Sequence, residues 1–370
     1  MIKYYVMSWI TKRIKDAARN DIDDIMNKNN YIYDTKDFED RFKRFTGASY
    51  CIGVSSGTAA LHLALDAIGI KKGDQGATVS HTFRATVAAI KYVGAKPVYV
   101  DIQAHSFCMD PLCLEKTLDN NPKIKAVIAV HLYGNSAEIV KIKNICESHN
   151  VKLIEDCSQA HGTFKQGKHV GTFGDIGTFS FFPGKGVGAF GDAGACVTNE
   201  KKYNDYITEA RSWKEDEIGY NYRMSTINAR FLHQKIDDYK RVLIEKREIA
   251  KKYDEHFRNT LVGPDVEHSY HIYSILHPHR DKLMEYCKEN GVELKCHYPL
   301  PVHKLPAYKT DFIKYLLPVT DIISQQQVSL PIYPGVDWER VVKVIKEYDD
   351  VSFAVRAEKR NKYGKVDENL

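Results

Sequence analysis

The chain has 370 residues, of which 43% are hydrophobic and 27% are charged. This balance is typical of globular proteins and excludes disordered, collagen-like and coiled-coil chains, and the length suggests about two to three folding units. The formal net charge is only +5, with basic and acidic residues interspersed, so nucleic acid is not an expected partner.

The sequence gives no indication of a membrane segment or a metal site. No stretch approaches the roughly 18 uninterrupted apolar residues of a membrane helix, and the N-terminus MIKYYVMSWITKRIK lacks the long apolar segment of a signal peptide. We therefore expect a cytoplasmic protein without membrane contact. The eight cysteines are scattered without a C-x-x-C pair, which favours reduced core thiols over a zinc site.

Strand-like apolar runs alternate with helical stretches from residue 59 onward. The predicted elements are a helix at 59–68, a strand at 77–83, a helix near 85–93, and strands at 96–102, 125–134 and 151–156 around a helix near 137–148. This alternation favours an α/β fold with a mainly parallel sheet covered by helices.

The second half of the chain predicts a different organisation. Residues 174–199 read as two strands joined by a glycine-rich loop, and the charged segment 228–258 reads as a long connecting helix. Beyond it, short strands and helices suggest a smaller α+β unit. We therefore predict a large domain at residues 1–240 and a small C-terminal domain at 241–370.

Ligands of open α/β folds bind outside the carboxyl ends of the strands, and three segments are expected to meet there. In the first, Ser56, Gly57 and Thr58 precede the predicted helix at 59–68. Free backbone N–H groups and the helix dipole could hold a phosphate at this point. The alternative is a helix N-cap by Ser56 or Thr58 with no ligand.

The second segment contains Asp156, at the end of the apolar strand VKLIED. A carboxylate there is costly to bury unless it meets a cation or hydrogen-bond donors. The protonated ring nitrogen of pyridoxal phosphate would serve, because pairing with an Asp strengthens that ring as an electron sink. Gln159 and His161, just beyond, could orient the carboxylate or the cofactor; the alternative is an Asp that caps a helix.

The third segment contains Lys185, which is surrounded by Gly184, Gly186 and Gly188 on a loop after a buried-looking strand. A lysine in a confined and partly dry loop has a lowered pKa and a nucleophilic amine that can form a Schiff base. The alternative is an ordinary surface lysine. The three segments together point to one cofactor site.

Seven blocks occur in an order that resembles the DegT/StrS-type sugar aminotransferases. They are SSGTAALHLAL, HTFRATVAAIKYVGAKPVYVDI, VIAVHLYG, LIEDCSQAHG, GDIGTFSFFPGKGVGAFGDAGACVTN, GYNYRM and SLPIYPG, and the resemblance runs from about residue 35 to 348. It implies the aspartate-aminotransferase-like fold type I, with a mainly parallel seven-stranded sheet and a smaller C-terminal α+β domain, and pyridoxal 5'-phosphate (PLP), alternating with its pyridoxamine form (PMP), as cofactor.

The resemblance also implies roles for individual residues. Lys185 would bond the cofactor covalently, Asp156 would pair with the ring nitrogen, and Phe83 would stack on the ring. The remaining implied cofactor contacts are Gly57, Thr58 and Ser180 at the phosphate, Gln159 beside the ring, and Asn221 at the phosphate of the partner subunit. A homodimer with shared active sites follows from the role of Asn221.

The sequence departs from the family pattern in three places. Gly186 stands where the family usually has Asn, and the stretch NNYIYDTKDFED lacks a glycine that often precedes the Phe-Glu pair of the family. His81 and Arg84 flank Phe83 without an assigned role and either touch substrate or cap the strand end. Some relatives carry His in place of the lysine and are dehydratases; the presence of Lys185 disfavours that alternative, although other fold type I chemistries share the cofactor site.

By resemblance, the predicted reaction is a ping-pong transfer of an amino group from L-glutamate to a nucleotide-linked keto-deoxysugar, for a surface polysaccharide such as lipopolysaccharide or for a glycosylated metabolite. The blocks FFPGK and HYPLPVH resemble members that act on 3-keto sugars, whereas GYNYRM is typical of 4-keto members; we favour the 3-keto sugar. Residues from His297 to His303 are expected to form the sugar wall or a Pro-rigidified loop. Arg84 and Arg223 are candidates for the diphosphate.

Overall fold

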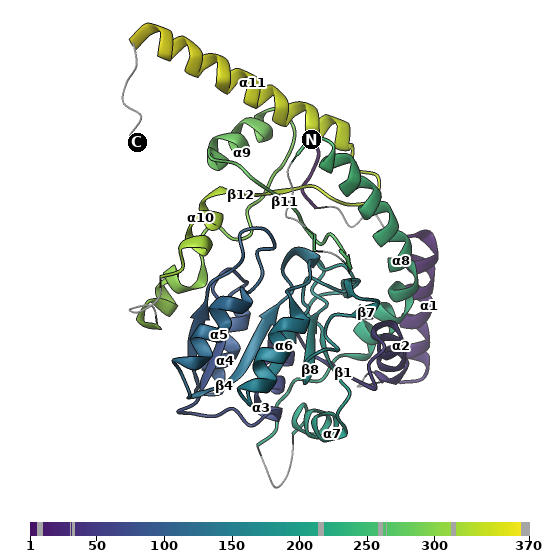
Figure 1. The fold of residues 1–370 in the computed structure, drawn as a ribbon. Helices are drawn as coiled ribbons and strands as arrows, with labels where there is room; N and C mark the ends of the chain where they lie inside the picture. The colour runs from purple at the N-terminus through teal and green to yellow at the C-terminus, as the bar shows by residue number, and fades with distance from the viewer. Residues whose placement is uncertain are drawn as a thin grey trace.

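The computed structural model describes residues 1–5, 10–29, 31, 34–213, 218–257, 262–263, 265–311 and 316–363 (Figure 1). In the last of these ranges, side chains are described up to residue 351. A seven-stranded sheet lies at its centre, in the order β1-β9-β8-β5-β4-β2-β3. Its strands are β1 (Tyr50–Val54), β2 (Gln75–Val79), β3 (Lys96–Val100), β4 (Ile124–Val130), β5 (Lys152–Asp156), β8 (Ile176–Ser180) and β9 (Gly194–Thr198).

The sheet is mainly parallel, as the sequence predicts. The neighbours β3, β2, β4, β5 and β8 pair in parallel, whereas β9 runs antiparallel to both β8 and β1. Because these strands run in the same direction, their carboxyl ends lie at the same edge of the sheet. This edge holds Asp156, the last residue of β5, and Ser180, the last residue of β8.

Helices cover both faces of the sheet. The helices are α1 (Lys12–Asn27), α2 (Lys36–Thr46), α3 (Gly57–Ala67), α4 (Ala85–Tyr92), α5 (Pro111–Asp119), α6 (Ile139–Ser148), α7 (Lys201–Ala210) and α8 (Thr226–Asp254). Apolar residues of α3, α4 and α7 share one core cluster with the sheet, and those of α2, α5, α6 and α8 form clusters on the other face. Strand residues alternate between them: in β1, Ile52 joins the first and Cys51 the second.

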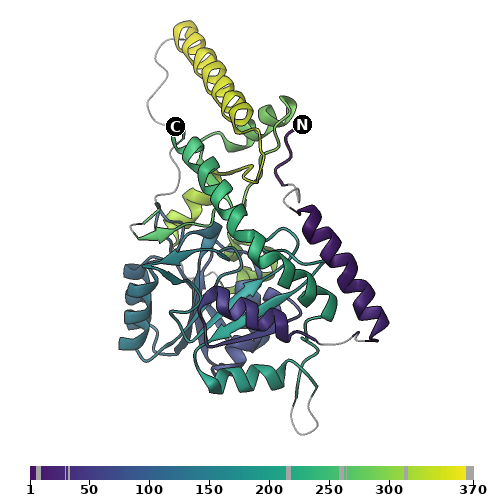
Figure 2. The same cartoon turned by 90° about the vertical axis from the view of Figure 1, so that its right-hand side faces the viewer.

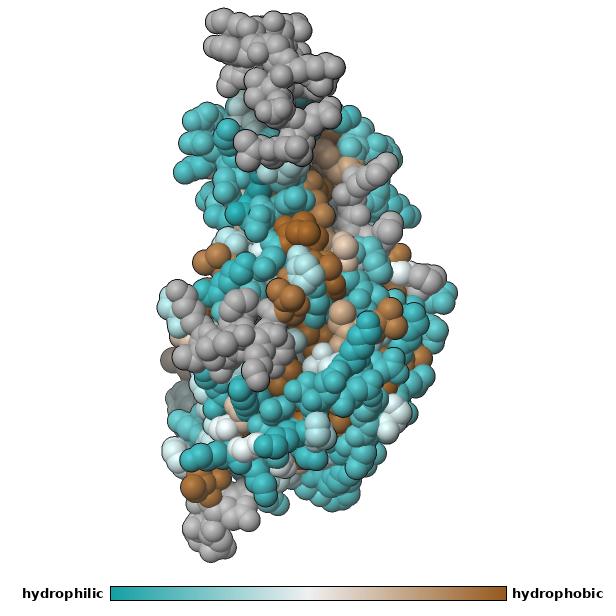
Figure 3. All heavy atoms as spheres, turned by 60° about the vertical axis from the view of Figure 1, so that its left-hand side comes forward, coloured by the Kyte–Doolittle hydropathy of each residue, from teal (hydrophilic) through white to brown (hydrophobic). Residues whose placement is uncertain are grey.

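We call the second unit the small lobe. It consists of the antiparallel pair β11 (Tyr273–Leu276) and β12 (Gln327–Leu330) with α9 (Arg280–Glu289), α10 (Pro318–Gln326) and α11 (Trp338–Tyr363). Short elements complete the fold: β6 (Phe164–Lys165), β7 (Lys168–His169), β10 (Val266–Glu267) and the 3-10 turns Leu132–Gly134, Val302–Lys304 and Pro306–Asp311. Figure 3 shows hydrophobic residues gathered along the middle of one face, between the small lobe and the rest of the molecule.

The long helix α8 joins the two lobes. Figure 2 shows it running from the small lobe down along the sheet-bearing part, where α1 lies beside it. The predicted domain boundary at residue 240 falls inside this helix. The first residues of the chain also cross the boundary, because Ile2 forms a parallel bridge with Val292 of the small lobe.

Two properties concern the whole described chain. All eight cysteines are free thiols, and six of them are buried. In the ranges given above, no helix is long and apolar enough to cross a membrane.

Candidate active site

A cavity of about 590 Å³ opens at the carboxyl edge of the sheet, between the sheet, α8 and the small lobe. It collects most of the residues that the sequence singles out. The predicted residues that line it are Gly57, Thr58, Phe83, Asp156, Gln159, Ser180, Lys185 and His297. The predicted residues that do not line it are Arg84, Asn221, Arg223 and His303.

The start of α3 forms one end of the cavity. Ser56 is the N-cap, and its Oγ accepts a hydrogen bond from the N–H of Ala59 at 3.0 Å. Helix geometry leaves the N–H groups of Gly57 and Thr58 without partners inside the helix. A Cβ at Gly57 would lie 2.6 Å from the Cβ of Ser180, so only glycine lets the helix end and the Ser180 side chain meet. The Ser56 cap therefore leaves the N–H groups of Gly57 and Thr58 available to an anion.

Asp156 projects into the cavity from the end of β5. Its side chain accepts a hydrogen bond from Thr86 Oγ1 at 2.8 Å and one from the backbone N–H of Ser158 at 3.1 Å. The residue is only 4% exposed. Thr86 lies in α4 and was not among the residues predicted from the sequence, since the distance of 70 positions from Asp156 leaves no local signal.

Lys185 lies on the loop after β8 and faces the same cavity. Burial lowers the pKa of its amine to about 8, and the nearby charge of Asp156 partly opposes this shift. The amine therefore loses its proton more readily than that of an ordinary lysine, as a nucleophile or general base requires.

The structure gives a reason for Gly186, the departure from the family pattern next to Lys185. A Cβ at this position would lie 2.3 Å from the hydroxyl oxygen of Tyr239, which is buried in α8. The Tyr239 ring thus occupies the space that a side chain at residue 186 would need. The loop is also held from the N-terminus, because the Tyr5 hydroxyl donates to the carbonyl oxygen of Pro183 at 2.5 Å.

The histidines near Lys185 are held in the neutral form. Burial, together with the positive charge of Lys185, lowers the pKa of His161 to about 3 and that of His297 to about 4. The same two causes keep the pKa of His271 well below its usual value. Lys185 is therefore the group in this cluster that is best able to take up a proton near neutral pH.

Gln159 connects the sheet-bearing part of the chain to the segment that leads into the small lobe. Its Oε1 accepts from the N–H of Tyr133 at 2.8 Å, and its Nε2 donates to the hydroxyl of Tyr298 at 3.1 Å. The hydroxyl of Tyr133 in turn donates to the carbonyl oxygen of His297 and lies 2.8 Å from His81 Nε2. His81, unassigned by the sequence, thus supports the His297–Tyr298 wall of the cavity from behind.

Four candidate substrate or partner contacts lie elsewhere. His303 is buried, with Nδ1 2.7 Å from Ser80 Oγ, so the expectation that it walls the sugar pocket is not supported by this placement. Arg84 is exposed, with its guanidinium 5.5 Å from the centre of the Phe83 ring. Arg223 donates to Asn221 Oδ1 at 3.0 Å, and Asn221 is exposed.

The side chains that sequence reasoning missed come from distant parts of the chain. Those lining the cavity include Tyr4, Tyr5, Thr86, Lys246 and His271. Tyr298, which also lines the cavity, belongs to the stretch from His297 to His303 that the sequence did single out. No motif distinguishes Tyr5 or Lys246 from other surface-like residues in their segments.

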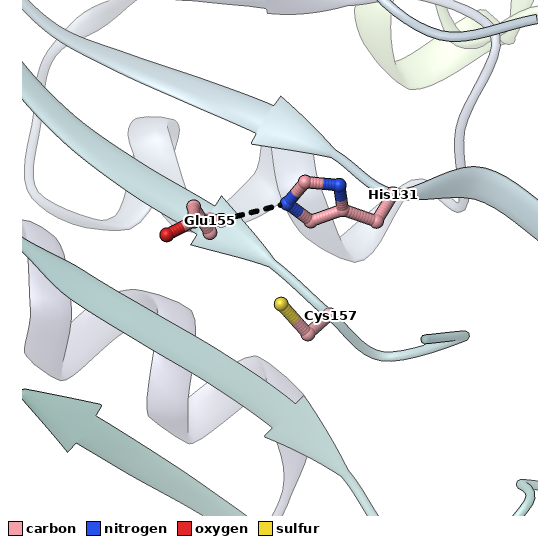
Figure 4. Close-up of side chains that lie close together, drawn as sticks. All are labelled: His131, Glu155 and Cys157. Atoms are coloured by element: carbon pink, nitrogen blue, oxygen red, sulfur yellow. Dashed lines mark hydrogen bonds and ion pairs between the residues drawn. The ribbon is translucent and has the colours of Figure 1, made fainter. Parts of the chain in front are cut away.

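A second cluster lies beside the cavity. His131, Glu155 and Cys157 place their ligand atoms within 4.8 Å of one another (Figure 4). The Nε2 of His131 contacts Glu155 at 2.9 Å, and its Nδ1 accepts from the N–H of Ala137, so both imidazole nitrogens are engaged.

The remaining atoms of this cluster are also unsuited to a metal. The Glu155 carboxylate accepts three backbone N–H groups, from Gly171, Phe173 and Gly174. Burial raises the pKa of Cys157 well above its usual value, which keeps the thiol protonated, whereas a metal binds the thiolate. We interpret the cluster as a structural hydrogen-bond network.

The cavity fits PLP by its donor set. One end offers backbone N–H groups and a serine hydroxyl to a phosphate, one wall offers a buried carboxylate to a ring nitrogen, and a lysine with a lowered pKa lies between the lobes. Phe83, 47% exposed at the cavity, offers a ring face for stacking.

Comparisons with known proteins agree with this chemistry. Residues 12–348 match the DegT/DnrJ/EryC1/StrS aminotransferase family. The dTDP-3-amino-3,6-dideoxy-alpha-D-galactopyranose transaminase of Aneurinibacillus thermoaerophilus is 35% identical over 94% of this chain and 98% of its own length. The GDP-perosamine synthase of Escherichia coli O157:H7 is 34% identical over 88% of this chain and 91% of its own.

A solved structure shares the fold closely. DesV of S. venezuelae, solved in complex with a ketimine intermediate, superposes with a TM-score of 0.89. It is 27% identical, and the match covers 94% of this chain and 98% of DesV. The predicted fold type I architecture is thereby confirmed.

Proposed function

Since this chain belongs to the DegT/DnrJ/EryC1/StrS aminotransferase family and is a PLP-dependent aminotransferase, we propose that it transfers an amino group from L-glutamate to a nucleotide-linked 3-keto-deoxysugar. The observation that carries the proposal is the pairing of Lys185 and Asp156 in one cavity that also contains the N-terminus of α3. An amine, a carboxylate and a phosphate site are the groups that transamination requires.

The residues would divide the work as follows. Bound PLP supplies an electron sink for the carbon that loses its proton. The first turn of α3 and Ser180 would hold the phosphate, Phe83 would offer its ring face to the cofactor ring, and Asp156 would keep a proton on the ring nitrogen. Thr86 holds the Asp156 carboxylate in place through its 2.8 Å hydrogen bond.

Lys185 would carry the proton. Its amine removes the α-proton of the donor amino acid in the first half-reaction and delivers a proton to the sugar carbon in the second. A pKa of about 8 suits both directions, because the amine can be neutral in one step and charged in the other near neutral pH. The neutral histidines around it do not compete for the proton.

Two relatives bear on the sugar. One, at 35% identity, is named for a 3-amino sugar linked to dTDP, which supports a 3-keto acceptor. The other, at 34% identity, is named for a GDP-linked product, so the two relatives differ in the nucleotide. His297 and Tyr298 line the cavity and would form the wall that turns the hexose, while Arg84 and Arg223 remain candidates for the diphosphate.

We also propose a homodimer in which Asn221 completes the phosphate site of the partner subunit. Asn221 is exposed and does not line the cavity of its own chain. Its contact with Arg223 fixes the side chain on the surface close to β1, because Arg223 bridges to Val54. A surface asparagine held in this way can reach a neighbouring copy of the chain.

The test is a panel of nucleotide-linked 3-keto and 4-keto deoxysugars, each mixed with the protein and L-glutamate. We expect the 3-keto sugars to gain nitrogen, seen as a 3-amino sugar by mass spectrometry. Turnover of 4-keto sugars alone would contradict the regiochemistry. Loss of water without gain of nitrogen would instead support the alternative of a PLP-dependent dehydratase.

A further inference from the structure

Lys246 is a buried amine that faces the cavity and takes no part in the roles assigned above. It lies on α8, is 7% exposed, and lines the same cavity as Lys185. Among the residues that the structure describes, none forms a hydrogen bond or ion pair with its amine. The amine is therefore aimed into the cavity without a counter-ion from the chain.

Other cations of the same helix show that this is unusual. Lys235, also buried, donates to the carbonyl oxygen of Gly188 at 2.5 Å and lies over the Phe231 ring. Arg247, the next residue after Lys246, donates to the carbonyl oxygens of His268 and Gly162 at 2.9 and 3.2 Å. Arg247 thus fixes this turn of α8 and leaves Lys246 facing the cavity.

A buried ammonium group without a partner destabilises the unliganded protein. Burial lowers the pKa of Lys246 to about 7, so part of the protein carries this charge near neutral pH. The neighbouring imidazoles of His268 and His271 supply no negative charge to balance it, and burial lowers the pKa of both, which keeps them neutral. An anion that enters the cavity would supply the missing partner.

The position of Lys246 selects the kind of anion. The cofactor phosphate is assigned to the start of α3, whereas Lys246 lies on α8. The positive charges of Lys246 and Lys185 both lower the pKa of His271, so the two amines lie near the same imidazole. The missing group therefore belongs to a substrate whose reacting atom lies at Lys185. A dicarboxylic amino acid carries such a charge on a short chain.

We propose that Lys246 binds a carboxylate of the amino-acid donor, an inference that rests on the transaminase function proposed above. The contact is a charge-assisted hydrogen bond between the Lys246 ammonium and a carboxylate oxygen. It is made in the half-reaction with the amino acid.

The binding test uses the holoenzyme and glutarate, a dicarboxylate that lacks the amine and cannot react. Calorimetric titration of glutarate should show about 10- to 100-fold weaker binding in Lys246→Met than in the wild type. Lys246→Arg should recover most of the affinity, and Lys251→Met, at an exposed lysine of the same helix, should bind like the wild type. Equal affinity in Lys246→Met would overturn the proposal.

Half-reaction kinetics identify the substrate. In Lys246→Met the KM for L-glutamate should rise by about 10- to 100-fold, while conversion of the keto sugar by the PMP form stays near wild type. A loss confined to the sugar half-reaction would assign the anion to the nucleotide diphosphate and overturn the donor site. Because glutarate binding needs no sugar turnover, it can support the site even if the proposed acceptor is wrong.

Discussion

Glu155 and Asp156 are neighbouring carboxylates on β5, and the structure uses them in opposite ways. Successive strand residues point to opposite faces of a sheet, so the two side chains enter different surroundings. Glu155 meets the His131 imidazole and three backbone N–H groups and is fully buried. Asp156 accepts one hydrogen bond from a hydroxyl and one from a backbone N–H, and it lines the cavity.

The different hydrogen-bond partners give the Glu155 carboxylate a structural role and the Asp156 carboxylate a functional one. The oxygens of Glu155 are engaged by donors of the chain, so the carboxylate stabilises the fold and offers nothing to a ligand. Asp156 is positioned by two donors and faces a cavity that also contains Lys185. Variants at the two positions should therefore fail in different ways, in activity at Asp156 and in stability at Glu155.

The largest effect is expected on the cavity side, from Lys185→Ala. Removal of the amine takes away both the covalent attachment of PLP and the proton carrier, so turnover should fall by about 10⁴-fold or more. The absorption of the cofactor attached to lysine should disappear as well. Full turnover in Lys185→Ala, measured with glutamate and keto sugar, would exclude the mechanism.

Asp156→Asn should lower kcat by about 10²- to 10³-fold, because a neutral amide supports a proton on the ring nitrogen poorly. The melting temperature should change little, since the amide oxygen can still accept the hydrogen bond from Thr86. Thermal unfolding and single-turnover rates check the two parts. Near-normal rates would remove Asp156 from this role.

Glu155→Gln should show the opposite pattern, with a loss of unfolding free energy of about 3 kcal/mol and a smaller effect on the chemistry of folded protein. Burial alone would raise the pKa of Glu155, but the hydrogen bonds from His131 and the backbone lower it below the usual value. The stabilisation is therefore present above about pH 4.5 and is lost as the pH falls further.

Denaturant unfolding at a series of acidic pH values measures this contribution. The acid-dependent part of the stability should shrink in Glu155→Gln. The control is Cys157→Ala, which changes an uncharged neighbour and should leave the acid-dependent part as in the wild type. Because we interpret the cluster as a hydrogen-bond network, a chelator should leave the stability of the wild type unchanged. A drop in stability on chelation would reveal a metal there.

The shared-site proposal predicts recovery of activity in mixed dimers. Lys185→Ala and Asn221→Ala subunits, each inactive alone, should form hybrids with one site free of both substitutions. Equal mixing should restore about a quarter of the wild-type rate, because half of the dimers are hybrids with one intact site of two. A fully active monomer in light scattering would refute the proposal.

The smallest effect is expected at the N-terminus, which reaches the cavity beside Lys185. Tyr5→Phe removes the hydroxyl that binds the Pro183 carbonyl, a single hydrogen bond worth about 1 kcal/mol. The kcat should fall by about 3- to 10-fold with little change in melting temperature. An unchanged kcat would mean that the loop of Lys185 needs no support from Tyr5.

The sequence determined those parts of the fold and of the cavity that depend on local pattern. The alternation of strands and helices between residues 59 and 156 agrees with α3, β2, α4, β3, β4, α6 and β5, and the predicted long helix at 228–258 agrees with α8. The segments before residue 59, which form α1, α2 and β1, were not predicted. Asp156, Lys185 and the turn at Gly57 stand in short motifs at strand or helix ends, and all three line the cavity.

Tertiary structure alone decided which side chains complete the cavity and which stay outside it. Tyr5, Thr86 and Lys246 reach it from distant segments, and His303 turns into the core against Ser80 although it shares a motif with His297. Likewise, the sequence singles out Asp156 for the cavity but does not predict that Glu155 meets His131 and three backbone N–H groups. These arrangements depend on contacts between residues far apart in sequence, and local periodicity carries no information about such contacts.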